Sequence, residues 1–355
     1  MQEWLLTGPR QLALVEYEDP PLADNEIRVR TLVTGVKRGT ELTLYRGSGP
    51  MHRKTFDLTY RAMVEAGGPT YPRGLGSWGV GEVIAVGRAV SRYRAGDRVH
   101  GNFRHRPTLT FPLDAAGERI GHAGGASLRP LPPDLDPTAA LFCDPAMFAL
   151  AAVHDAQIKV GDAVAVFGMG AIGLLAVQCA RLQGADPLIA VDPIAERLAL
   201  ARVYGATHAL GASVGDPGLA IKELTPRRGV DAALEISGSY AALQQAIRSV
   251  QAGGTVVTLG YYPGTGGEAL RLGEEWHHNR VQLLSSMIVW GNAHRSAPLW
   301  DEQRVVATVE DLLRRGRLRW AEMVTHRLPY ARAPEAYALY DQHPEQAIKI
   351  VLEYA

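Results

Sequence analysis

A glycine-rich turn with an acidic residue downstream is the strongest chemical signal in the sequence. The turn reads Gly168-Met-Gly-Ala-Ile-Gly173, follows a short apolar run and opens an apolar helical segment. Asp192 ends the next apolar run, 19 residues after Gly173. This context is typical of a dinucleotide site, in which glycines form the turn and the helix N-terminus binds the pyrophosphate. We therefore expect a cofactor-binding set for NAD, made of Gly168, Gly170, Ile172, Gly173 and Asp192.

Two other ligands use related turns, and both fit this sequence less well. FAD sites usually lie near the start of a chain, whereas this turn begins at residue 168. S-adenosylmethionine enzymes share a glycine-rich turn and an acidic residue but rarely keep this glycine spacing. A carboxylate can accept hydrogen bonds from the ribose hydroxyls, whereas a 2′-phosphate would meet a like charge at Asp192. NAD is therefore preferred over NADP.

The elements expected around the turn are short strands that alternate with helices of 10–15 residues. The apolar runs predict strands and the 3.6-residue pattern predicts helices, which together indicate βαβ units, a parallel sheet and helices on both of its faces. The expected strands are 163–167, 188–191, 209–210, 232–236 and 255–259, and the expected helices are 171–182, 194–204, 219–225 and 240–250.

The first 130 residues have a different character. Short alternating segments bounded by Gly, Pro and Asp, such as 27–33, 80–86 and 97–100, predict mostly antiparallel strands. Residues 138–154 read as one helix of small apolar residues. Near the C-terminus, 302–315 predicts an amphipathic helix and 347–352 a last strand.

Composition excludes several classes of protein. The chain has 355 residues, which suggests about two domains. With 37 Lys and Arg against 37 Asp and Glu, it lacks the basic surplus on which nucleic-acid binding rests. Two cysteines, Cys143 and Cys179, cannot build a disulfide framework or a four-cysteine zinc site. The apolar stretch 163–180 is long enough to suggest a membrane span, but its three glycines argue against one, so we expect a cytoplasmic protein without a membrane partner.

With these segments the chain resembles the medium-chain dehydrogenase/reductase superfamily, the zinc alcohol dehydrogenase relatives. The likeness is carried by segments 81–87, 96–99, 161–173, 196–206 and 326–340. It implies an α/β fold in which a Rossmann doubly wound parallel sheet is inserted in a β-rich, GroES-like catalytic domain. The catalytic domain would comprise 1–149 and 288–355, and the NAD-binding domain 150–287. The resemblance further implies that Arg197 approaches the adenosine, and that Ser237, Gly260 and Ser286 line the nicotinamide side. In each case a helix-surface, capping or turn role is the alternative.

The sequence departs from this family where its catalytic zinc binds. The usual cysteine corresponds to Arg38, and the usual His-Glu pair to Ser77 and Trp78. Only an acidic position survives, as Asp144. A catalytic zinc needs about three protein ligands, so we expect no metal. The segment Gly35-Val-Lys-Arg-Gly-Thr-Glu41 is similar to that of a zinc-less branch.

By this resemblance the same segment faces the nicotinamide and supplies the catalytic groups. Hydride transfer to a carbonyl builds negative charge on oxygen, which must be stabilised and protonated. Thr40 aligns with the proton-relay position, and Lys37 or Arg38 could offset the charge. Glu41 and Asp144 complete the catalytic set, with Asp144 as an anchor for a cation or a substrate hydroxyl. The alternatives are solvated loop charges and helix caps. His105 reads as structural or surface.

Three functions remain open at this point. The leading one is a zinc-independent, NAD(H)-dependent oxidoreductase that interconverts an alcohol and a carbonyl on a small molecule such as a sugar, a cyclitol or a secondary metabolite. The others are reduction of an activated C=C bond and non-catalytic dinucleotide binding. The resemblance and the apolar segment 281–290, read as an edge strand that could pair with itself, suggest a homodimer.

Overall fold

A computed structural model of the chain describes all residues except 49–51, 69, 121–127, 214, 227 and 289–298. It divides into two compact units. The β-rich unit comprises Met1–Phe142 and Met323–Ala355, and the parallel-sheet unit comprises Cys143–Glu322. The sequence predicted that the first part of the β-rich unit ends at residue 149, seven residues after Phe142, and that its second part begins at residue 288 instead of Met323. The second part begins later because helix α9 (Glu302–Arg314) packs on helix α3 (Cys143–Asp155) inside the parallel-sheet unit.

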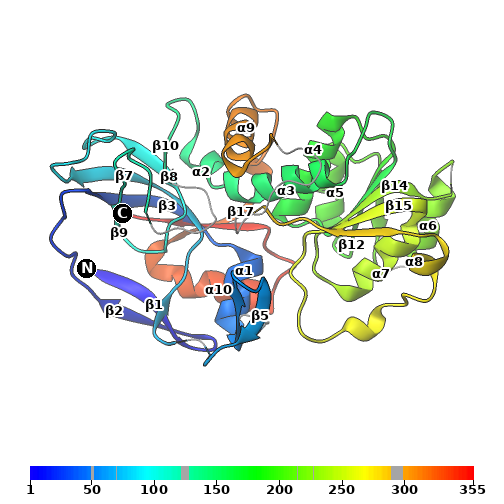
Figure 1. The fold of residues 1–355 in the computed structure, drawn as a ribbon, viewed down its shortest axis with the longest axis horizontal. Helices are drawn as coiled ribbons and strands as arrows, with labels where there is room; N and C mark the ends of the chain where they lie inside the picture. The colour runs from blue at the N-terminus through cyan, green and yellow to red at the C-terminus, as the bar shows by residue number, and fades with distance from the viewer. Residues whose placement is uncertain (49–51, 69, 121–127, 214, 227, 289–298) are drawn as a thin grey trace. The chain divides into compact units, whose positions relative to one another are not determined.

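The described residues of the β-rich unit form three sheets. This unit is the left half of Figure 1. The largest has the strand order β10-β8-β7-β3-β18-β17, with β9 also paired to β3. The small sheets have the orders β2-β1-β6 and β4-β5. The strands are β1 Gln2–Gly8, β2 Gln11–Glu16, β3 Glu26–Gly35, β4 Lys54–Asp57, β5 Ala62–Glu65, β6 Arg73–Gly74, β7 Trp78–Val86, β8 Arg98–Gly101, β9 Thr108–Pro112, β10 Arg129–Pro130, β17 Val324–Pro329 and β18 Lys349–Glu353. The helices are α1 Arg38–Arg46, α2 Pro137–Ala140 and α10 Ala333–Gln342.

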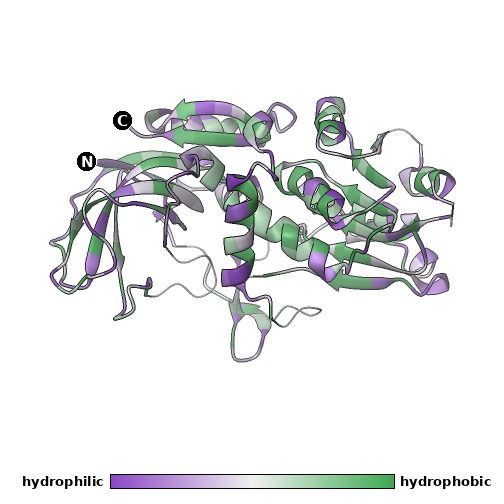
Figure 2. Cartoon of the chain, turned by 90° about the horizontal axis from the view of Figure 1, so that it is seen from above, coloured by the Kyte–Doolittle hydropathy of each residue, from purple (hydrophilic) through white to green (hydrophobic). Residues whose placement is uncertain are grey.

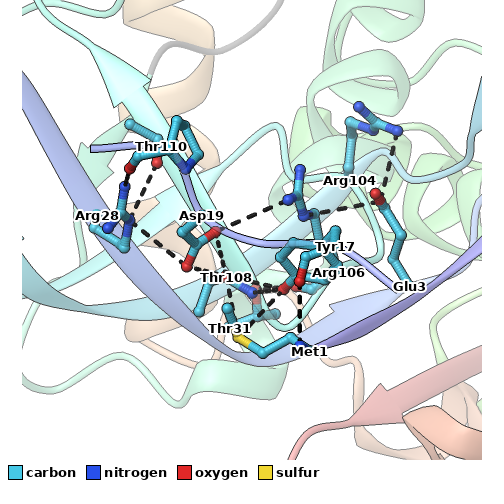
Figure 3. Close-up of polar contacts among 11 residues, drawn as sticks. Met1, Glu3, Tyr17, Asp19, Arg28, Thr31, Arg104, Arg106, Thr108 and Thr110 are labelled. Carbon is cyan, nitrogen blue, oxygen red and sulfur yellow. Dashed lines mark hydrogen bonds and ion pairs between the residues drawn. The ribbon is translucent and has the colours of Figure 1, made fainter. Parts of the chain in front are cut away.

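A polar cluster fixes the segment just before β9 in this unit (Figure 3). The Arg106 guanidinium lies 3.6 Å from the centroid of the Tyr17 ring. The hydroxyl of Thr108 donates to Asp19 at 2.7 Å, and the hydroxyl of Thr31 donates to the carbonyl of Arg106 at 2.6 Å. Residues 106–108 are therefore held by contacts with β3 and with residues 17–19, which follow β2.

The parallel-sheet unit contains six strands in the order β13-β12-β11-β14-β15-β16, all paired in parallel. Chain order reverses beside β11, which is the doubly wound arrangement that the sequence predicted. The strands are β11 Val164–Phe167, β12 Leu188–Asp192, β13 His208–Gly211, β14 Val230–Glu235, β15 Val250–Thr258 and β16 Gln282–Ser285. The helices are α3, α4 Ala171–Gln183, α5 Ala195–Val203, α6 Pro217–Leu224, α7 Tyr240–Ser249, α8 Glu275–His278 and α9.

Helices cover both faces of this sheet (Figure 1). Helices α4 and α5 contact strands β11, β12 and β13, and helices α6 and α7 contact strands β14 and β15. On one face of the sheet, a core cluster joins Ala165 of β11, Ile189 of β12 and Ala233 of β14 to Leu243 and Ile247 of α7. Burial on both faces explains why the central strands are continuous apolar runs, visible as green strands in Figure 2. None of the helices described is long and apolar enough to cross a membrane.

The single helix expected over 138–154 is two helices, α2 and α3. Asp136 caps α2 by accepting hydrogen bonds from Thr138 N and Ala139 N. Pro145 has no N–H and its ring would clash with the preceding turn, so the chain begins a new helix there instead of continuing α2.

Candidate dinucleotide and catalytic site

The glycine-rich turn joins the end of β11 to the start of α4. Gly168 has φ +97°, which non-glycine residues rarely adopt. A Cβ on Gly173 would lie 1.8 Å from the Gly168 carbonyl oxygen, so the helix approaches the turn as closely as backbone allows. Gly170 is the N-cap of α4, makes no side-chain cap, and has open space where its Cβ would be. The residues present therefore fit an anionic ligand at the α4 N-terminus, beside the half-buried Ile172.

Asp192 ends the neighbouring strand β12, and its carboxylate binds the turn itself. One oxygen accepts from Met169 N at 2.7 Å, and the other accepts from Ile194 N at 2.9 Å. The side chain is only 4 % exposed. Each carboxylate oxygen has a second lone pair, so the same group can also accept from a ribose hydroxyl. Asp192 thus joins the two strand ends, a structural role that the sequence did not predict.

A pair of alanine substitutions separates packing from ligand access in this turn. Gly173→Ala should destabilise the protein by about 1–3 kcal/mol, because its Cβ collides with rigid backbone. Gly170→Ala should leave the melting temperature unchanged and weaken NADH binding, because its Cβ enters the space left for the pyrophosphate. Thermal unfolding and NADH fluorescence titration measure the two effects. Equal NADH affinity in Gly170→Ala and the parent would contradict this placement of the ligand.

A second turn lies beside the first, after strand β14. A Cβ on Gly168 would lie 2.9 Å from the Ser237 Cβ, and a Cβ on Gly260 would lie 2.2 Å from the Gly238 N. The structure therefore brings Gly168, Ser237 and Gly260 together at the carboxyl edge of the sheet. Ligands of open parallel sheets bind at this edge.

Glu235 accepts hydrogen bonds from this second turn. The sequence did not predict a role for it. Its fully buried carboxylate accepts hydrogen bonds from Ser237 N at 2.8 Å, from the Ser237 hydroxyl and from the Tyr262 hydroxyl. Burial raises the pKa of Glu235 above its ordinary value despite these donors. An acidic residue at the end of an expected strand was the available signal, but its partners are distant in sequence.

The remaining predicted cofactor residues lie in the same unit. Arg197 is in the first turn of α5, five residues after Asp192, and is 5 % exposed. Ser286 directly follows β16; its N–H donates to the Thr258 carbonyl at 2.8 Å and its buried hydroxyl has no partner among the residues described. The solvated-surface alternative for Arg197 does not hold, because its side chain is buried.

The predicted catalytic segment starts helix α1 in the β-rich unit. Lys37 is the N-cap, and Arg38 and Thr40 are exposed in the first turn. Strand β18 holds the residues before it: Val36 N donates to the Ile350 carbonyl at 3.0 Å, and the Lys349 ammonium donates to the Val36 carbonyl at 3.4 Å. Lys37, Arg38 and Thr40 therefore follow a residue that β18 holds through two hydrogen bonds.

Glu41 differs from its neighbours because it is buried, with 1 % of its surface exposed. Its carboxylate contacts the His105 ring at 3.0 Å and accepts from the Tyr337 hydroxyl at 2.6 Å and from Lys37 N at 2.8 Å. Burial raises the pKa of Glu41, but His105 and the hydrogen bonds outweigh it and hold the pKa below its ordinary value. Burial and the charge of Glu41 raise the pKa of the Tyr337 hydroxyl well above the ordinary value of a tyrosine.

Four residues align, by the resemblance, with the zinc-ligand positions of the family. Arg38 is exposed on α1, while Ser77 and Trp78 are buried at the start of β7. Asp144 lies in the first turn of α3, in the other unit. Among the described residues, no three His, Cys, Asp or Glu side chains gather where they could hold an ion. A catalytic zinc needs about three protein ligands, and of these four positions only Asp144 carries a side chain that commonly binds zinc.

Known proteins are similar to the chain over its whole length. The family model for zinc-binding dehydrogenases matches residues 171–301. D-guloside 3-dehydrogenase of Escherichia coli (strain K12) is 35 % identical, covering 99 % of each chain. Sorbitol dehydrogenase of Bacillus subtilis (strain 168) is 32 % identical over 73 % of this chain and 75 % of its own.

A solved structure shows the same fold. It is a candidate zinc-binding dehydrogenase from Sinorhizobium meliloti 1021 bound to NADP, with a TM-score of 0.78 and 24 % identity, and the match covers 99 % of this chain and 98 % of that one. At this identity the likeness concerns the fold alone.

Proposed function

Because the chain belongs to the medium-chain dehydrogenase/reductase superfamily, the zinc-type alcohol dehydrogenase relatives, we propose that it is an NAD(H)-dependent oxidoreductase that interconverts an alcohol and a carbonyl without zinc. The observation that carries the proposal is the uncapped N-terminus of α4 at Gly170, beside the carboxylate of Asp192. We assign cofactor binding to the parallel-sheet unit, the catalytic groups Lys37, Arg38 and Thr40 to the β-rich unit, and the supporting carboxylate Asp144 to the parallel-sheet unit.

The cofactor-binding residues divide between two ends of the ligand. The α4 N-terminus, with Gly168, Gly170, Ile172 and Gly173, would hold the pyrophosphate. Asp192 and Arg197 would hold the adenosine half, and Ser237, Gly260 and Ser286 the nicotinamide half. When bound, NAD supplies the acceptor for a hydride.

The catalytic proposal assigns roles to the start of α1. Oxidation of an alcohol would remove a hydride from its carbon, for which bound NAD would be the acceptor, and a proton from its hydroxyl, leaving a carbonyl. Thr40 would take that proton onward, and Lys37 or Arg38 would stabilise the negative charge on oxygen. Asp144 would orient a cation or a substrate hydroxyl. Glu41 is almost completely buried and cannot touch a substrate, so its proposed role is to support the catalytic groups.

The zinc proposal makes a direct prediction. The purified protein should contain no stoichiometric zinc and should keep its activity after dialysis against a chelator, because Arg38, Ser77 and Trp78 occupy the family's ligand positions. Elemental analysis by mass spectrometry measures this. One zinc per chain, lost together with activity, would overturn the proposal.

The substrate class follows from two relatives with sugar and polyol substrates in their names. We propose a secondary alcohol on a sugar, glycoside or cyclitol. NADH fluorescence on binding, followed by turnover with ketosugars, simple ketones and enones, tests it. Turnover of enones alone would favour the C=C reductase, and binding without any turnover would favour the non-catalytic alternative.

A homodimer is part of the proposal. Among the residues that the structure describes, β16 is the last strand of the six-stranded sheet, and pairing with a second copy would extend the sheet at that edge. Of the expected pairing segment 281–290, residues 289 and 290 lie outside the part of the chain that the structure describes.

A further inference from the structure

We infer that a buried chain of side chains, Thr34, His105, Glu41 and Tyr337, sets the position of the Lys37–Thr40 turn, so that Glu41 and His105 are positioning residues for the reaction. This inference rests on the function proposed above for that turn. The resemblance assigns a role to Glu41 alone. It assigns none to Thr34, His105 or Tyr337.

His105 joins the two ends of the turn. Its Nδ1 lies 2.7 Å from the Thr34 hydroxyl, and its Nε2 lies 3.0 Å from a Glu41 carboxylate oxygen. Thr34 precedes Lys37 by three residues and Glu41 follows Lys37 by four. One imidazole ring therefore bridges the strand that leads into the turn and the helix that leaves it.

The backbone of His105 is itself fixed, so the ring is a rigid anchor. His105 N donates to the Leu75 carbonyl at 2.8 Å, and its carbonyl accepts from the Tyr330 hydroxyl at 3.0 Å. Its two neighbours, Arg104 and Arg106, both form ion pairs with Glu3 at 3.8 Å (Figure 3). The polar cluster around β1 and β3 thus holds the segment that carries this ring.

Glu41 transmits this anchor to the turn. One carboxylate oxygen accepts from Lys37 N, the N-cap of α1, and the other contacts His105 and the Tyr337 hydroxyl. Tyr337 belongs to α10, so α1 is also tied to a neighbouring helix at its start. Thr40 lies next to Glu41 in sequence and shares this first turn of α1.

Burial makes the chain of contacts hard to replace. Thr34, Glu41 and His105 are 0 %, 1 % and 4 % exposed, so water cannot take the place of a lost partner. A buried group without a partner is costly, and the turn would shift to satisfy it. Because a displacement of about 1 Å at a reacting group can cost about a hundredfold in rate, even a small shift would be measurable.

The opposite end of α1 provides a matched control. There the Asp341 carboxylate of α10 accepts from Arg46 at 2.5 Å and from Arg10 at 2.6 Å. Asp341→Asn therefore weakens another polar link between the same two helices without touching the turn. Tyr337→Phe removes one hydroxyl from the network, and Glu41→Gln keeps the oxygen that accepts from Lys37 N.

The test combines kinetics with a measurement that does not depend on activity. Glu41→Gln should lower kcat about tenfold or more and leave NADH affinity unchanged, Tyr337→Phe should lower kcat in the same direction, and Asp341→Asn should leave it at the parent value. Amide exchange at Glu41 N, which donates to the Lys37 carbonyl at 2.9 Å, should accelerate in the first two variants only.

Each other outcome excludes one part of the argument. Faster exchange with unchanged kcat would show that the network holds the turn but that the turn is not catalytic. That result would overturn this inference and the catalytic roles assigned to the turn, and would leave the proposed cofactor binding in place. Unchanged exchange in Glu41→Gln and Tyr337→Phe would overturn the inference alone. A loss of kcat confined to Glu41→Gln, with one limb of the pH–rate profile missing, would make Glu41 a proton-transfer group instead.

Discussion

Replacing Thr40 by valine should lower kcat about a hundredfold or more while NADH affinity stays nearly unchanged, because removing a well-placed oxyanion donor typically costs about 2.7–4 kcal/mol. Valine keeps the shape of threonine and deletes the hydroxyl. Thr40 is exposed at the start of α1, so its loss creates no cavity. The residues assigned to cofactor binding all belong to the other unit, so the affinity for NADH should not change.

The cations beside Thr40 provide the comparison. Lys37→Met and Arg38→Met, made singly, keep most of each side chain's length and remove its charge. Steady-state kinetics in both directions, with NADH titration as the control, show which cation contributes. If all three variants turn over within about threefold of the parent, a change below 1 kcal/mol, the turn is structural and Asp144 becomes the next candidate.

The unmodified protein should prefer NAD(H) over NADP(H) by at least about a hundredfold, close to 2.7 kcal/mol. A 2′-phosphate placed at the adenosine ribose would meet the carboxylate of Asp192. Two unit charges about 4 Å apart repel by roughly 4 kcal/mol at an effective dielectric of 20, and less where solvent screens them. Dissociation constants of NADH and NADPH, measured by fluorescence, test this. Equal affinities would exclude the assignment.

Asp192 also binds two backbone N–H groups, so its variants should affect NADH affinity as well as the cofactor preference. Asp192→Gly should relax the preference and also weaken NADH binding, because Met169 N and Ile194 N lose their acceptor. Asp192→Asn removes the charge and keeps one acceptor oxygen, so it should relax the preference with a smaller loss of NADH affinity. If NADPH binding improves in neither variant, another residue sets the cofactor preference.

The sequence by itself determined the fold of the parallel-sheet unit. Its signals are local: apolar runs of strand length, a helical period between them and a glycine turn at β11. Each depends on residues close together in the chain, so the order of strands and helices from 163 to 258 was predicted, with shifts of one or two residues at most ends and of five at the start of β15. The turn itself was recognisable because glycine is required by a positive φ at Gly168 and by a backbone contact at Gly173.

Only the tertiary structure decided which polar residues work together. Glu41 contacts His105, which lies 64 residues later in the chain, and Tyr337, which lies 296 residues later. Glu235 likewise meets Tyr262, which lies 27 residues later. Hydrogen bonds between side chains depend on the packing of distant elements and leave no periodic pattern in the sequence. For this reason the residue types of the catalytic turn could be listed from the sequence, whereas the burial of Glu41 and the anchor provided by His105 could not.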